Sequence, residues 1–166
     1  EADTKVGAVV SAAHQAKILS YIALAQEEGG TILTGGHAVQ LEGRCKDGYF
    51  VAPTVIEGLS HDCRTNQEEI FGPVVTIMPF DTEQQAWDLA NGTDYGLVAG
   101  IFSNDINRCL RGSRALRAGQ VFVNEWYAGG IETPFGGTGL SGFGREKGQE
   151  ALYSYVQTKN IAIRIS

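Results

Sequence analysis

The first regular pattern of apolar positions in the chain predicts an amphipathic helix. Ser11 has the side chain of a good N-cap, and the Gly29-Gly30 pair ends the pattern. Between these two points the apolar residues recur three or four positions apart, at Ile18, Leu19, Ile22 and Ala25. One face of this helix is therefore expected to lie in the core.

After this helix, short apolar or β-branched stretches alternate with helical patterns. The expected strands are 31–34, 48–56, 74–80, 98–103 and 120–124, with Pro53 favouring an edge or an interruption in the second. Asp81 or Thr82 can cap a helix that runs to Asn91-Gly92, and Asn104 or Asp105 can cap another that reaches Gly119. Residues 59–67 look irregular, 148–155 helical, and 160–165 alternate isoleucine with other residues as a terminal strand would.

Strands alternating with helices of this length predict an α/β fold. Right-handed crossovers would give a mainly parallel sheet with helices on both faces, which makes three layers. The chain shows no internal repeat and no dividing linker, so one domain is expected. Ligands of such folds bind at the carboxyl ends of the strands, where the long segment after Asn124 lies.

The composition of the chain argues against several classes of binding partner. Thirteen basic and nineteen acidic residues give a net charge of −6, which argues against a nucleic-acid or anionic membrane surface. No apolar run approaches the ~20 residues of a membrane helix, and no amino-terminal signal pattern is present. The three histidines stand in separate segments without ligand spacing, so no metal site is expected.

The three cysteines are widely spaced and odd in number, which favours a reducing, cytoplasmic setting over a disulfide framework. Cys45 lies between two cations, Cys63 lies in a polar loop, and Cys109 is spaced to face inward on its helix. For each of them an inert thiol is favoured over a catalytic one.

The most glycine-rich stretch, residues 134–146, contains a literal Gly-x-Gly-x-x-Gly at Gly137, Gly139 and Gly142. In dinucleotide-binding proteins this motif directly follows a strand and opens a helix whose N-terminus faces the pyrophosphate. Here the preceding strand is expected to end at Asn124, and the next helix begins only after Arg145. A tightly turning ordered loop is therefore favoured, and a small Rossmann-type nucleotide binder stays a weaker alternative.

A second unusual stretch is Gln67-Glu68-Glu69-Ile70-Phe71-Gly72-Pro73-Val74, in which two acids precede an aromatic residue and a turn that feeds a strand. A carboxylate in this place can accept two hydrogen bonds from a ribose diol, and a neighbouring ring can pack against a nicotinamide. Physics alone favours a plainer interpretation, a solvated acidic turn with Phe71 in the core. Both interpretations stay open at this point.

Four ordered motifs together resemble the NAD(P)-dependent aldehyde dehydrogenase superfamily. They are 68–73 (Glu-Glu-Ile-Phe-Gly-Pro), 91–97 (Asn-Gly-Thr-Asp-Tyr-Gly-Leu), 119–124 (Gly-Gln-Val-Phe-Val-Asn) and 134–146, and the resemblance covers essentially the whole chain. It implies the carboxyl-terminal portion of an aldehyde dehydrogenase catalytic domain at 1–157 and an oligomerisation strand at 158–166. It also implies homo-oligomers formed through that strand, which would join a neighbouring subunit's sheet.

The resemblance assigns roles to individual residues. Glu69 would hold the nicotinamide ribose and Phe71 would contact the nicotinamide, while His14 and Lys17 would approach the adenosine side; His14 departs from the glutamine of some members. Phe135 would line the aldehyde pocket, and Glu146 would pair with an upstream lysine and relay protons to the general base. The substrate-side loop would comprise Asn124, Glu125, Trp126 and Tyr127.

The chemistry implied by the resemblance is oxidation of an aldehyde to a carboxylic acid with NAD or NADP through a cysteine thiohemiacetal. The Gly-Gln-x-Cys context of the family's nucleophile is absent from these 166 residues, as are the general base and the phosphate-binding segment. We therefore expect the chain to need an amino-terminal dinucleotide-binding region and to be inactive alone. A non-catalytic interaction or oligomerisation module is the alternative from another class.

Overall fold

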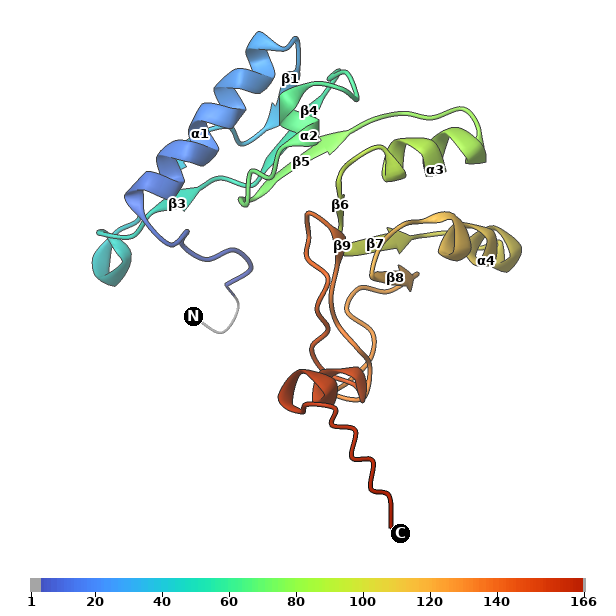
Figure 1. The fold of residues 1–166 in the computed structure, drawn as a ribbon. Helices are drawn as coiled ribbons and strands as arrows, with labels where there is room; N and C mark the ends of the chain where they lie inside the picture. The colour runs from blue at the N-terminus through green and yellow to red at the C-terminus, as the bar shows by residue number, and fades with distance from the viewer. Residues whose placement is uncertain (1–3, 166) are drawn as a thin grey trace. The chain divides into compact units, whose positions relative to one another are not determined.

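The computed structural model describes residues 4–165, which divide between Asp81 and Thr82 into two compact units (Figure 1). Both units combine short strands with helices, so the α/β class is confirmed within each of them.

The first unit is built on helix α1 (Ala12–Glu27), whose N-cap is Ser11. Its buried face consists of Ile18, Ile22 and Ala25, as the spacing predicts, while Leu19, which is also expected on this face, is only half-buried. This face packs into two apolar clusters with Val51 and with Ile56, the latter from the three-stranded sheet beside the helix. Burial of these side chains fixes the rotation of α1 about its own axis. This rotation in turn decides which side chains lie on the other faces of the helix.

The three-stranded sheet has the order β1–β4–β5, with strands β1 (Thr31–Thr34), β4 (Thr54–Glu57) and β5 (Val74–Ile77). Strand β4 is antiparallel to β1 and parallel to β5. Strands β2 (Ala38–Val39) and β3 (Phe50–Val51) form a separate antiparallel pair, and the predicted interruption falls at residues 52–53, between β3 and β4. Two short helices complete the unit, the 3₁₀ helix η1 (Gly43–Cys45) and α2 (Arg64–Gln67), the latter inside a stretch expected to be irregular.

The second unit contains a parallel pair of strands joined by a helical crossover. Strands β7 (Val98–Ile101) and β8 (Gln120–Val123) lie in parallel register, and α4 (Ile106–Ala115) connects them. Strands β6 (Tyr95–Gly96) and β9 (Thr138–Gly139) pair antiparallel. Helix α3 (Glu83–Asn91) precedes β6, and the 3₁₀ helix η2 (Glu150–Tyr155) stands where a helix over 148–155 is predicted.

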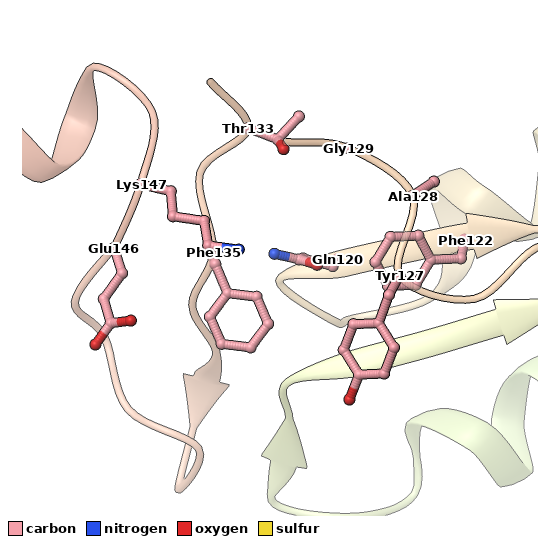
Figure 2. A pocket seen from close by; sticks show the side chains of 9 residues that line it. All are labelled: Gln120, Phe122, Tyr127, Ala128, Gly129, Thr133, Phe135, Glu146 and Lys147. Atoms are coloured by element: carbon pink, nitrogen blue, oxygen red, sulfur yellow. The ribbon is translucent and has the colours of Figure 1, made fainter. Parts of the chain in front are cut away.

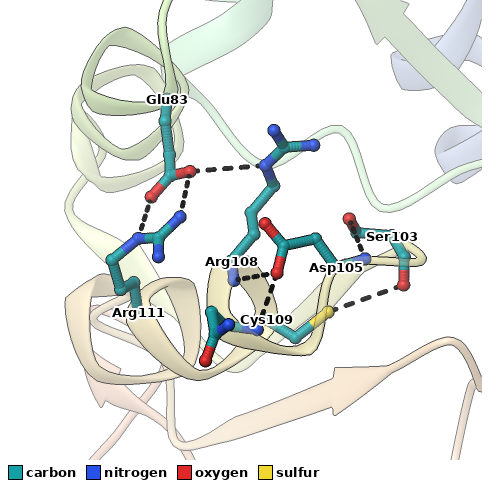
Figure 3. Close-up of polar contacts among 7 residues, drawn as sticks. Glu83, Ser103, Asp105, Arg108, Cys109 and Arg111 are labelled. Atoms are coloured by element: carbon teal, nitrogen blue, oxygen red, sulfur yellow. Dashed lines mark hydrogen bonds and ion pairs between the residues drawn. The ribbon is translucent and has the colours of Figure 1, made fainter.

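Helices α3 and α4 are joined by charged side chains (Figure 3). Both oxygens of the Glu83 carboxylate accept hydrogen bonds from Arg111, at 2.6 and 2.9 Å, and Arg108 Nε lies 3.3 Å from one of them. The hydrogen bonds from Arg111 lower the pKa of Glu83 to about 2. Asp105 caps α4, as one of the two predicted caps.

The expectation of one mainly parallel sheet is not met within the described residues. Their strands form four separate sheets, of which the three-stranded one is mixed and two of the two-stranded ones are antiparallel. Sheet membership depends on pairing between distant segments, which periodicity does not encode. Residues 156–165 contain neither helix nor strand, so the predicted terminal strand has no partner within the described chain.

Candidate functional site

One face of α1 lies along residues 68–71. His14, Lys17 and Tyr21 follow one another at helical spacing on this face. The His14 Nε2 atom lies 2.6 Å from the carbonyl oxygen of Phe71, and Lys17 Nζ donates a 2.8 Å hydrogen bond to the carbonyl oxygen of Glu69. The Tyr21 hydroxyl donates to the Glu68 carboxylate. The four residues that the resemblance assigns to the cofactor are thus neighbours in space.

The two adjacent acids of this segment have different surroundings. Glu68 accepts hydrogen bonds from Arg64 at 2.7 and 3.1 Å, and these bonds, followed by that from Tyr21, lower the pKa of Glu68 to about 2. The same Tyr21 hydrogen bond raises the pKa of the Tyr21 hydroxyl. The Glu69 side chain is exposed and makes no hydrogen bond or ion pair with the residues described here. Of the two carboxylates, that of Glu69 is the one without a partner among the described residues, while Glu68 is held by Arg64 and Tyr21.

Phe71 is not a core residue, so the plainer interpretation of the motif is wrong on this point. Its side chain is 74% exposed, its backbone φ is 58°, and its ring stands edge-on to His14 with centroids 6.0 Å apart. The next residue is glycine because a Cβ there would lie 2.6 Å from Ile18 Cδ1. Close contact with α1 at Gly72 therefore leaves the preceding ring on the surface.

Glu69 and Phe71 line a shallow cavity of about 260 Å³. The other residues around it come from α2, the motif itself and β5: Thr65, Asn66, Glu68, Ile70, Gly72, Val74 and Thr76. An unpaired carboxylate beside an exposed ring can accept hydrogen bonds from a diol and pack against a planar heterocycle. These are the two contacts that a nicotinamide riboside offers.

A second cavity, of about 310 Å³, lies within the other unit (Figure 2). It is lined by three of the predicted site residues, Tyr127, Phe135 and Glu146, together with Gln120, Phe122, Ala128, Gly129, Thr133 and Lys147. Lys147 Nζ lies 5.9 Å from the centroid of the Phe135 ring. This hollow offers aromatic walls with one carboxylate and one ammonium group at its edge.

Only part of the predicted substrate-side loop lines this cavity. Tyr127 lines it. The Trp126 ring packs edge-on against Tyr127 and at a tilt against Phe122, with ring centroids 5.9 Å apart in each pair. Asn124 instead hydrogen-bonds the backbone of Ser103, accepting at 2.8 Å and donating at 2.9 Å, and Glu125 is exposed. Neither Asn124 nor Glu125 is among the residues around the cavity.

The glycine-rich stretch forms a strand and a turn, as the tight-loop interpretation predicts. Gly137 stands just before β9, and Gly139 ends that strand with a φ of 59°. The amides that follow are all used inside the unit: Leu140 donates to Asp94, Ser141 to Thr138 and Gly142 to Gly139. These amides are thus not free to hold a pyrophosphate, and no helix of the described chain starts at the motif.

None of the three cysteines is among the residues that line either cavity. Cys109 is 1% exposed and faces inward, as predicted, and burial raises the pKa of the Cys63 thiol. Cys45 stands at the end of η1. Within residues 4–165 no three histidine, cysteine or acidic side chains are grouped as a metal site would require. The helices of this part of the chain are also too short or too polar to cross a membrane.

Sequence reasoning missed Tyr21, Arg64 and the distinct role of Glu68. The spacing of Arg64 and Glu68, four residues apart, is a signal for a helical ion pair that was available. Tyr21 lies four residues after Lys17 and therefore on the same helix face. Its contact with Glu68 joins residues 47 positions apart and is visible only in the fold.

Comparison with known proteins finds a match to the profile of the aldehyde dehydrogenase family over residues 1–161. A 2-aminomuconic 6-semialdehyde dehydrogenase of Pseudomonas sp is 44% identical over 99% of this chain and 34% of its own length. A 4-trimethylaminobutyraldehyde dehydrogenase A of Danio rerio is 42% identical over 98% of this chain and 32% of its own. The chain spans about a third of the length of these relatives.

Solved structures give the same match. An indole-3-acetaldehyde dehydrogenase mutant of P. syringae in complex with NAD+ superposes with a TM-score of 0.89 at 38% identity, over 98% of this chain and 32% of that one. The betaine aldehyde dehydrogenase of Staphylococcus aureus in complex with NAD+ superposes with a TM-score of 0.85 at 43% identity, over 93% and 31% of the two chains.

Proposed function

The chain belongs to the aldehyde dehydrogenase family, and from this premise we propose that its protein oxidises an aldehyde to a carboxylic acid with NAD or NADP. The observation that carries the proposal is the convergence of His14 and Lys17 on a segment more than 50 residues away, at Glu69 and Phe71. Relatives solved with NAD+ support the choice of cofactor.

In this proposal the first unit holds the nicotinamide riboside part of the cofactor. The Glu69 carboxylate accepts hydrogen bonds from the ribose diol, and the exposed Phe71 ring packs against the nicotinamide. His14 and Lys17 hold the backbone of both residues and lie toward the adenosine side. When bound, the cofactor supplies the acceptor for a hydride.

The second unit contributes the aldehyde pocket. Phe122, Tyr127 and Phe135 provide apolar walls that exclude water from an aldehyde's carbon chain. The exposed Glu146 carboxylate at the edge of the pocket accepts and returns protons, as the resemblance implies. Trp126 and Asn124 stabilise this loop, Trp126 through its tilted ring contact with Phe122 and Asn124 through its two hydrogen bonds to Ser103.

We further propose that the nucleophilic cysteine lies outside these 166 residues, so that this chain alone does not turn over aldehydes. Cys109 is buried, and neither Cys45 nor Cys63 is among the residues around either cavity. Purified chain mixed with NAD and a simple aldehyde is expected to form no reduced cofactor. Sustained turnover that disappears when one of the three cysteines is replaced by serine would refute this part of the proposal.

The cofactor role is tested in the full-length gene product by measuring NAD affinity. Glu69→Gln is expected to raise the Kd for NAD and to slow the transient formation of reduced cofactor. The matched control is Glu57→Gln, an exposed glutamate at the end of β4 in the same unit. Equal Kd values and transient rates for Glu69→Gln and the unmodified protein would contradict the assignment.

A second candidate function is an interaction or oligomerisation module. Its support is the exposed terminal segment, in which Ile161, Ile163 and Ile165 are 72%, 79% and 91% exposed. Exposed alternating isoleucines that pair with no strand of the described residues suit a strand that completes the sheet of another copy.

A further inference from the structure

We propose that Tyr21, Arg64 and Glu68 form a clamp that positions Glu69 for the cofactor; this inference rests on the proposed function. Glu68 is the centre of the clamp, and Tyr21 and Arg64 are its two donors. None of the three contacts the cofactor in this proposal. They act through the backbone of the neighbouring Glu69.

The clamp joins α1 and α2 at one carboxylate. Tyr21 comes from α1 and Arg64 from the first position of α2, while Glu68 follows the end of α2. Arg64 binds both oxygens of Glu68, which restricts the rotation of the carboxylate as well as its position. The end of α2 is therefore fixed to the middle of α1.

The beginning of α2 is fixed to the C-terminal end of α1. The Glu28 carboxylate, at the C-cap of α1, accepts hydrogen bonds from the backbone amides of Arg64 and Thr65 at 2.9 and 3.2 Å and from the Thr65 hydroxyl at 2.6 Å. The Thr65 hydroxyl is the main cause of the lowered pKa of Glu28. Contacts with α1 fix both ends of α2. The position of Glu68, directly after α2, is therefore fixed as well.

Two further contacts hold the segment after Glu68. Lys17 holds the carbonyl group of Glu69 and His14 that of Phe71, so the motif is tied to α1 at three points, Glu68, Glu69 and Phe71. These bonds use the Glu68 side chain but only the backbone of Glu69. The Glu69 carboxylate is thereby left toward the cavity, with the backbone that carries it already ordered.

An ordered backbone at Glu69 strengthens cofactor binding because a preorganised site loses less conformational entropy when the ligand binds. If Glu68 is released, Glu69 samples more positions and fewer of them match the ribose. The second unit contains a comparable cluster, that of Glu83 with Arg108 and Arg111, and none of these three residues is among those around the two cavities described above. Glu83→Gln is therefore a matched control for the loss of a surface carboxylate cluster.

The experiment measures the Kd for NAD by calorimetric titration of the full-length gene product, without aldehyde. Glu68→Gln is expected to raise the Kd about fivefold and Tyr21→Phe two- to threefold, orders of magnitude expected for lost preorganisation. Glu83→Gln is expected to leave the Kd unchanged. Tyr21→Phe keeps the ring and serves as the second test if Glu68→Gln does not fold.

A double-mutant cycle separates positioning from a general loss of structure. If Glu68 acts through Glu69, then Glu68→Gln has little further effect on Kd once Glu69→Gln is present. An equal fold change in both backgrounds, or no change on Glu68→Gln and Tyr21→Phe, overturns the clamp. If Glu69→Gln itself leaves the Kd unchanged, the proposed cofactor role fails; if only Glu69→Gln weakens binding, the clamp alone fails.

Discussion

Phe135 and Glu146 exchange two backbone hydrogen bonds, with N to O distances of 2.6 and 2.7 Å. The pair closes the base of the glycine-rich loop and places a half-buried ring and an exposed carboxylate side by side on one cavity. The loop between them returns on itself because glycines allow backbone to approach backbone. Within the loop, a Cβ on Gly136 would lie 2.2 Å from the carbonyl oxygen of Gly144. Gly119, before β8, approaches the same loop, and a Cβ there would lie 1.7 Å from the carbonyl oxygen of Gly136.

Gly119→Ala is therefore expected to destabilise the second unit. The methyl group meets backbone atoms that cannot rotate away, and overpacking of this kind costs on the order of 1–3 kcal/mol. The measurement is the free energy of unfolding in urea. Gly144→Ala is the control, because a Cβ there meets nothing within 4 Å. Equal stability of the two variants would show that the loop does not pack as described.

The ion pairs of Glu83 should make the stability of the protein depend on pH. Its pKa lies at about 2 in the folded protein, below its ordinary value of 4.5. A lowered pKa contributes stability above about pH 4.5, and this contribution is lost as the pH falls to about 2. The difference in unfolding free energy between the unmodified chain and Glu83→Gln should therefore shrink over this range. Because the group is on the surface, high salt should also reduce the difference at neutral pH. A pH-independent difference would contradict the ion-pair origin.

Phe71→Ala should weaken NAD binding with little effect on stability. The ring is 74% exposed, so its removal costs little apolar burial, but in the proposed function it is the surface for the nicotinamide. Phe143→Ala is the control, since Phe143 is 98% exposed and lies in the glycine-rich loop of the other unit. Calorimetry gives the Kd and thermal unfolding gives the stability. A large fall in stability without a change in Kd would reverse the interpretation of Phe71.

Asn124→Ala should loosen the end of β8 and the predicted substrate-side loop that follows it. The change removes two hydrogen bonds to the Ser103 backbone, each worth about 1 kcal/mol at most in an exposed position. Asn124 has a φ of 55°, so Asn124→Gly separates the loss of the side chain from backbone strain. Faster hydrogen exchange at the Ser103 amide in both variants is the expected result. Unchanged exchange would show that the bonds do not hold this end of the strand.

Removal of residues 158–166 should reduce self-association of the full-length gene product. The exposed isoleucines would no longer be available to pair with a neighbouring sheet. Light scattering measures the mass of the assembly, and Lys159→Ala is a control that keeps the isoleucines. An unchanged mass after truncation would exclude the terminal segment as the assembly strand.

The local features of this chain were determined by the sequence alone. The cap at Ser11 and three of the four expected buried positions of α1 follow from side-chain chemistry and helical spacing, and they are confirmed. For α3 and α4 the sequence offers two caps each, and the structure uses Thr82 and Asp105. The family and its candidate residues were also accessible from ordered motifs. Local rules suffice here because caps and helix faces involve residues within a few positions of one another.

Tertiary structure decided which atoms of those residues are free. Glu68 and Glu69 are equivalent in the sequence, but contacts from Tyr21 and Arg64 use the first carboxylate and leave the second exposed. From the sequence, Phe71 is expected in the core. In the structure, Gly72 packs closely against α1 and the Phe71 ring lies on the surface. These outcomes depend on contacts between segments about 50 residues apart, and the geometry of such contacts is set only when the core has packed.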